Sequence, residues 1–131
     1  MRLFALLRDR RGAAVIEMAI ALPVLIFLIY GIFEASLLFR ANAGMQHGLG
    51  EGARYATIYP TPSDSAINTK VTNALFGMED AKPGFPTVTV VPDTTAKTKT
   101  ITVTYKKDVD FLFMATRTVT ITHSKKAYVA Q

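Results

Sequence analysis

Residues 13–33 read AAVIEMAIALPVLIFLIYGIF, a run of 21 residues in which Glu17 is the only charged side chain. At 1.5 Å of rise per residue, a helix of this length is about 30 Å long, which is the thickness of the hydrocarbon core of a bilayer. The run therefore predicts a membrane-spanning helix. We place this helix at residues 13–39, because apolar side chains continue to Phe39.

Arginines are concentrated on one side of the apolar run. Four of them, Arg2, Arg8, Arg10 and Arg11, precede it, whereas Arg40 is the only basic residue in the dozen positions that follow Phe33. Positively charged flanks stay in the cytoplasm. The sequence thus predicts a single-pass protein with residues 1–12 as a basic cytoplasmic leader and residues 40–131 as a domain outside the cytoplasm.

A cleaved secretory signal is the alternative, with a cleavage site of small residues at Ala41-Asn42-Ala43. The apolar run is longer than the 7 to 15 residues of a typical signal core. In addition, Glu34 and Arg40 interrupt the approach to that site. A retained membrane helix fits these features better.

The composition argues against several classes of function. The net charge of +5 falls to +2 without residues 1–12, because 11 basic and nine acidic residues remain. A domain with so small a net charge is not predicted to bind nucleic acid. The chain has no cysteine, and neither His47 nor His123 has a partner at metal-ligand spacing. No phosphate-binding loop or nucleophile motif is present. We therefore expect no enzyme activity, metal or cofactor.

The helix is predicted to continue past the membrane to about Ile58, before Pro60. Over this part the apolar residues recur at steps of three and four, which is the pattern of an amphipathic helix. They are Leu38, Ala41, Met45, Leu49, Ala53 and Ala56.

Three glycines, Gly44, Gly48 and Gly52, lie four positions apart in the same segment. Each costs about 1 kcal/mol relative to alanine in a helix. Three on one face therefore suggest helix packing, with close approach by another backbone. The alternative is that they simply loosen the helix.

The rest of the chain predicts a short helix and a small sheet. Ser63 or Asp64 can cap a helix that reaches about Phe76. Three runs then alternate threonine with apolar residues: 87–91, 99–106 and 117–123, the last with a possible continuation to residue 129. One apolar face per strand indicates a sheet covered on one side. We predict an α+β fold with a three- to four-stranded antiparallel sheet packed on the long helix.

The connection at residues 108–116 is unusually apolar, because it contains Phe111, Leu112, Phe113 and Met114. These side chains either fill the core or form a contact surface for another subunit. The sequence leaves both open.

The run Arg10-Arg11-Gly12-Ala13-Ala14-Val15-Ile16-Glu17-Met18 resembles the processing site of type IV prepilins. In that family a membrane peptidase cuts after the glycine, and a glutamate is fifth in the mature chain. Gly12, Ala13 and Glu17 match those positions. Met18 departs from the pattern, because tight-adherence pilins commonly carry an aromatic residue there.

A second segment, GEGARYA at residues 50–56, is similar to one in TadE-like pseudopilins of tight-adherence (Tad) pili. With Pro23 in the span and threonine-rich strands at the end, the resemblance covers most of the chain. It implies a minor pilin of the bacterial inner membrane, processed by a prepilin peptidase, whose partners are other pilins and the Tad assembly platform. Its roles would be pilus assembly, surface adhesion or biofilm formation. The alternative is a membrane-anchored adhesion domain that never polymerises.

Glu17 is the charged residue of most interest, because a carboxylate at membrane depth is costly and is usually paired or functional. In one interpretation it reaches the cytoplasmic interface or Arg11. The resemblance implies the other, in which Glu17 assists assembly by pairing with the amino terminus of a neighbouring subunit.

Overall fold

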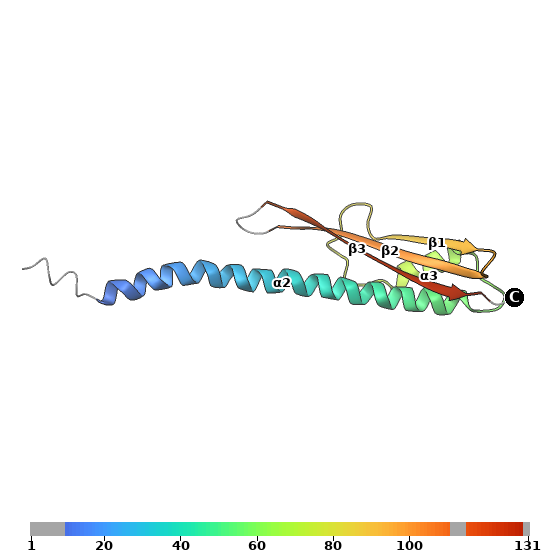
Figure 1. Ribbon diagram of the computed structural model, residues 1–131, viewed down its shortest axis with the longest axis horizontal. Coiled ribbons are helices and arrows are strands. Elements are labelled where there is room, and N and C mark those ends of the chain that lie inside the picture. Colours follow the sequence, from blue (N-terminus) through green and yellow to red (C-terminus); the bar gives the residue numbers. More distant parts are fainter. Residues whose placement is uncertain (1–9, 111–114, 130–131) are drawn as a thin grey trace, which may run out of the picture.

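The computed structural model describes residues 10–110 and 115–129, with side chains from Gly12 onward. One long helix, α2 (Arg10–Ala56), extends through the whole molecule and carries a small domain on its C-terminal half (Figure 1). The helix is continuous over 47 residues, with Pro23 inside it. The prediction of one unbroken helix is confirmed, and it ends two residues earlier than expected.

The two halves of α2 have different surroundings. From Gly12 to Phe33 the side chains are exposed, apart from the half-buried residues Phe27, Tyr30 and Gly31. Beyond Phe39 one face becomes buried, which confirms the amphipathic pattern. The buried residues of this face are Ala41, Met45, Leu49, Ala53 and Ala56.

The short helix α3 (Asp64–Ala74) packs against the C-terminal half of α2. The Ser63 hydroxyl accepts a hydrogen bond from the Ala66 amide at 3.1 Å, so Ser63 is the N-cap. Such a cap satisfies a backbone donor that the first turn leaves free. Ile67 and Val71 are fully buried and attach α3 to the core.

The sheet has three antiparallel strands in the order β1 (Thr87–Asp93), β2 (Thr98–Val109) and β3 (Arg117–Tyr128). The register pairs Thr104 of the central strand with Thr87 on one side and Thr122 on the other. The predicted fold class is confirmed: a long helix packed on a small antiparallel sheet.

Strand β2 is longer than predicted, because Asp108 and Val109 belong to it rather than to the following connection. Val109 is buried, so its burial extends the apolar side of the strand. Phe111 to Met114, which were expected either to fill the core or to form a contact surface, lie outside the described residues.

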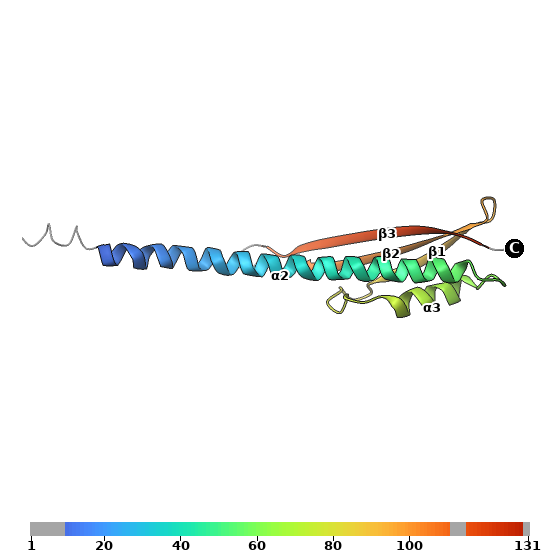
Figure 2. The same cartoon turned by 90° about the horizontal axis from the view of Figure 1, so that it is seen from below.

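The core lies between the sheet, α2 and α3. Ile101, Val103 and Tyr105 of β2 are fully buried, whereas the alternate threonines form the outer side of the sheet. Figure 2 shows the sheet along one side of α2 and α3 along another. Strand β2 runs antiparallel to α2, since Ile101 lies near Gly52 and Lys107 lies beside Glu34.

Candidate assembly surface

The predicted cleavage site lies at the start of α2. Gly12 and Ala13 are helical and exposed, and a Cβ atom on Gly12 would meet nothing within 4 Å. The peptide bond between Gly12 and Ala13 is therefore accessible from outside the helix.

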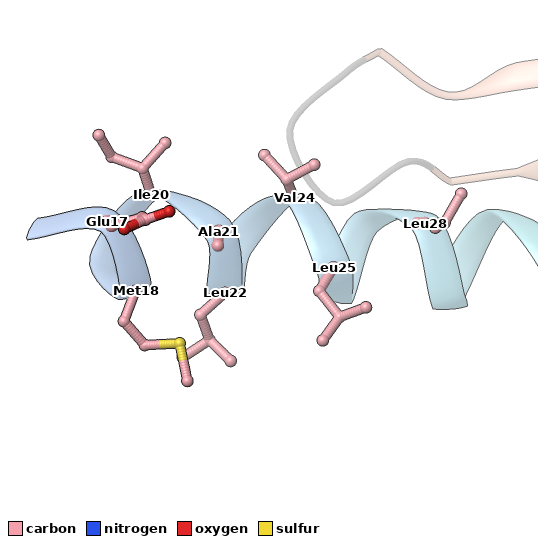
Figure 3. Close-up of a pocket in the computed structure, with 8 residues that line it drawn as sticks. All are labelled: Glu17, Met18, Ile20, Ala21, Leu22, Val24, Leu25 and Leu28. Atoms are coloured by element: carbon pink, nitrogen blue, oxygen red, sulfur yellow. The ribbon is translucent and has the colours of Figure 1, made fainter. Parts of the chain in front are cut away.

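Glu17 lies five residues further along, on the exposed half of α2. Figure 3 shows its carboxylate on the same face as Ala21 and Leu28, with apolar side chains on both flanks. Among the side chains that the structure describes, none forms a hydrogen bond or ion pair with Glu17, and the side chain of Arg11 is not among these.

The surface around Glu17 is an apolar depression that follows the helix. The small side chain of Ala21 leaves it open, and its lining consists of Glu17, Met18, Ile20, Ala21, Leu22, Val24, Leu25 and Leu28 (Figure 3). Such a surface is suited to lipid chains or to another helix. In either environment a carboxylate is stabilised by a positively charged partner.

The surface of α2 at the three glycines of the predicted packing stripe is covered by other parts of the same chain. A Cβ atom on Gly44 would lie 1.9 Å from the backbone oxygen of Phe76. On Gly48 it would lie 2.6 Å from a methyl group of Leu75, and on Gly52 it would lie 2.2 Å from one of Val71. The structure thus places all three against α3 and the segment that follows it.

A charged cluster that the sequence did not predict lies where the domain meets α2. The Lys107 ammonium is 2.8 Å from a carboxylate oxygen of Glu34 and 2.5 Å from one of Asp80. The Tyr105 hydroxyl donates to the other oxygen of Asp80 at 2.7 Å. The Lys107 side chain is only 6% exposed and that of Glu34 13%. This junction cluster of Glu34, Asp80, Tyr105 and Lys107 joins β2 to the helix.

The protonation states in the junction cluster reinforce one another. Burial alone would lower the pKa of Lys107, but its hydrogen bonds to Asp80 and Glu34 outweigh burial and raise that pKa. Burial would raise the pKa of Asp80, whereas the hydrogen bonds from Lys107 and Tyr105 bring it below its usual value. Burial and the Asp80 carboxylate raise the pKa of Tyr105. At neutral pH the cluster therefore contains an ammonium, a carboxylate at Asp80 and a neutral phenol.

The alternation of residues along β2 was the one sequence signal for this cluster. Lys107 follows Ile101, Val103 and Tyr105 at the same period of two, so it belongs to the apolar side of β2. A lysine on that side needs a buried counter-ion. The sequence does not identify Glu34, 73 positions earlier, as that counter-ion.

The described part of the chain contains no group of three or more His, Asp or Glu residues that could hold a metal ion. It does contain one helix long and apolar enough to cross a membrane, with a mean hydropathy of 2.5 in its most apolar window.

Comparison with known proteins gives a match to a protein-family model. A protein-family model described as TadE-like protein matches residues 12–54, which begin at Gly12 and end in the GEGARYA segment. No curated protein and no solved structure matches the chain. The match suggests a pilin-like protein associated with a Tad pilus.

Proposed function

We propose that this protein is a minor pilin of a Tad pilus, cut between Gly12 and Ala13 and assembled through the exposed half of α2. The observation that carries the proposal is the form of α2. Its uncovered apolar segment begins directly after Gly12 and continues without a break into a helix that forms the core of a small domain. Such a subunit presents a free helix to its neighbours while its domain stays folded.

Cleavage after Gly12 would create an ammonium group on Ala13, four residues before Glu17. These two charges lie about one turn apart, on the same side of the helix. In a bundle of staggered helices, the ammonium of one subunit reaches the Glu17 carboxylate of the next. Pairing removes an isolated charge from an apolar environment, and it favours the one offset between subunits that allows it.

The arginines of residues 1–12 support an inner-membrane location with the N-terminus in the cytoplasm. There the leader would meet the prepilin peptidase. The exposed apolar segment would then contact other pilins and the assembly platform. Surface adhesion or biofilm formation would follow from incorporation into the pilus.

The alternative is an anchored adhesion domain that keeps its leader and never polymerises. It uses the same span and domain, and differs in having no need for a peptidase that cuts after glycine. Processing therefore distinguishes the two functions.

Mass spectrometry of the mature N-terminus tests the proposal, and a pair of glycine variants sharpens it. Gly12→Val and Gly31→Val both add a side chain where nothing lies within 4 Å. Since neither creates a clash within the chain, only recognition by the peptidase should distinguish them. We expect the wild type and Gly31→Val to begin at Ala13, and Gly12→Val to keep its leader.

Two other results would replace the proposal. A mature chain that begins at Gly44 would indicate a secretory signal cut after Ala43. A wild-type chain that keeps residues 1–12 beside an active peptidase would favour the anchored adhesion domain.

A further inference from the structure

The sheet has two edges, because β1 and β3 each pair with β2 on one side only (Figure 1). Along a strand, the backbone N–H and C=O groups of successive residues point alternately to its two sides. The Val129 amide donates a hydrogen bond to the Lys97 carbonyl, at the end of the register between β3 and β2. The odd-numbered residues of β3 therefore pair with β2, and the even-numbered residues direct their backbone groups to the other side, which is the edge.

The edge of β1 is closed to a further strand. The Asn68 side chain of α3 donates a hydrogen bond to the Val88 carbonyl at 2.8 Å, so this carbonyl already has a partner. Pro92 lies four residues further along the strand and faces the same side, and proline has no N–H to donate. Proteins use such features to prevent other strands from pairing with an exposed edge.

The edge of β3 has neither feature. Its even-numbered residues Thr120, Thr122, Ser124 and Lys126 are all exposed, and the strand contains no proline. Within residues 12–110 and 115–129, no group forms a hydrogen bond with the backbone N–H or C=O of these four residues. Unpaired backbone groups along a strand are a template for another strand. The segment from Thr120 to Lys126, which we call the free edge, can therefore accept one.

The charges of β3 indicate which kind of strand fits the free edge. Lys125 and Lys126 are exposed, and neither forms an ion pair in the part of the chain that the structure describes. Successive residues of a strand project to opposite sides, so these lysines place one ammonium on each side of the sheet. The lysines that do have a carboxylate partner within the chain lie in other elements. They are Lys70, Lys82, Lys99 and Lys107.

A second copy of β3 is a poor occupant of the free edge. The strand contains no aspartate or glutamate, so two copies would bring their lysines into one ribbon without a carboxylate. Like charges on neighbouring strands oppose pairing, and edge lysines are a common protection against it. A strand with carboxylates at two successive positions would instead place one beside each ammonium. Charge complementarity therefore selects an acidic strand.

We propose that the free edge binds an extended acidic segment of a partner protein, which joins the sheet as a fourth strand. The backbone hydrogen bonds of strand addition provide the binding, and Lys125 and Lys126 provide the preference for carboxylates. This inference concerns the domain alone. It does not depend on cleavage after Gly12 or on the contacts of the exposed half of α2.

Two fluorescent peptides test the preference for carboxylates. Both are short and alternate threonine with valine, but one has two successive aspartates at its centre and the other has two lysines. We expect the full chain in micelles of a non-ionic detergent to raise the fluorescence anisotropy of the aspartate peptide only. The double variant Lys125→Glu and Lys126→Glu should reverse this preference, whereas arginine at both positions should retain it. Equal binding of the two peptides to the wild type, or binding of neither, would overturn the proposal.

Pairing through the backbone is tested at Thr122. Thr122→Pro removes the outward N–H, whereas Thr122→Val keeps it, and both remove the hydroxyl that lies 3.2 Å from that of Thr104. Proline is tolerated where the N–H of an edge strand faces outward, and circular dichroism can check that both variants fold. We expect Thr122→Pro to lose the aspartate peptide and Thr122→Val to retain it. Equal binding by two folded variants would overturn strand addition, and the lysine variants test the proposal even if Thr122→Pro does not fold.

Single cysteines locate the bound peptide, because the chain has none of its own. Thr89, Thr102 and Ser124 form one row across the sheet, with Thr89 in β1 and Ser124 in β3. A cysteine in the aspartate peptide should form a disulfide with a cysteine at position 124 severalfold faster than with one at position 89. Equal rates would overturn binding at the free edge. Faster formation of a disulfide between two copies at position 124 would identify a second copy, rather than an acidic partner, as the occupant.

Discussion

The backbone oxygen of Phe76 lies 1.9 Å from the point that a Cβ atom on Gly44 would occupy. The segment after α3 therefore passes so close to α2 that any side chain at position 44 would clash with it. Gly77 follows with a φ of 73°, a left-handed conformation that favours glycine. These two glycines hold the exit of α3 against the helix.

Gly44→Ala should therefore destabilise the domain. Because the new methyl group meets backbone rather than a flexible side chain, we expect the free energy of unfolding to fall by about 3 kcal/mol. Gly50→Ala is the control, since a Cβ atom there meets nothing within 4 Å and alanine favours the helix by about 1 kcal/mol. Urea unfolding in detergent micelles, followed by circular dichroism, measures both. Similar losses in the two variants would contradict the close approach at position 44.

The junction cluster predicts a loss of stability at alkaline pH. The pKa of Tyr105 is raised above its usual value of 10.0, so above about pH 10 the folded chain keeps a proton that the unfolded chain releases. The stabilisation is complete below that pH and is lost as the pH rises toward the raised pKa. Tyr105→Phe should make unfolding less sensitive to pH between about 10 and 12, whereas Tyr128→Phe, at an exposed position, should not. The same slope in both variants would count against Tyr105 as its source.

Replacing Glu17 tests the pairing that we propose for assembly. Glu17→Ala should leave expression, membrane insertion and cleavage after Gly12 nearly intact, because no described side chain depends on Glu17. It should impair co-purification with partner pilins, since the ammonium of the neighbouring subunit would lose its counter-ion. Glu34→Ala should have a milder effect, because Lys107 keeps Asp80 as a partner. Unchanged assembly of Glu17→Ala would leave this carboxylate as an interfacial residue.

The orientation is tested at the end of the chain. A reporter that is active only outside the cytoplasm, joined after Gln131, should be active because the arginines hold the N-terminus inside. Exchanging Arg8, Arg10 and Arg11 for glutamine should reduce that activity. Activity of a reporter that works only in the cytoplasm would reverse the orientation.

The regular parts of the fold could be predicted from the sequence because each has a local cause. Val103 alternates with threonines along β2, Ser63 caps α3, and the apolar run before Phe33 has the length of a membrane span. These signals act over a few residues, so they can be read without knowing the rest of the fold.

The contacts between distant segments could not be predicted in the same way. The glycine stripe indicated close approach by a backbone, but nothing local shows that α3 of the same chain makes it. Likewise, Lys107 on the apolar side of β2 requires a buried carboxylate, yet many acidic residues would satisfy that need. The choice of Glu34 and Asp80 depends on how far β2 runs back along α2, which is a property of the packed domain.

The division of α2 at Glu34 makes the protein modular. The segment before it presents mostly exposed apolar side chains, while the segment after it packs against the chain's own sheet and α3. A chimera could therefore carry the span of a different pilin on this domain without altering the core around Met45 and Leu49. Under the proposed function, the helix surface that contacts other subunits and the fold of the domain can then change independently during evolution. Glu34 marks the boundary between these two segments.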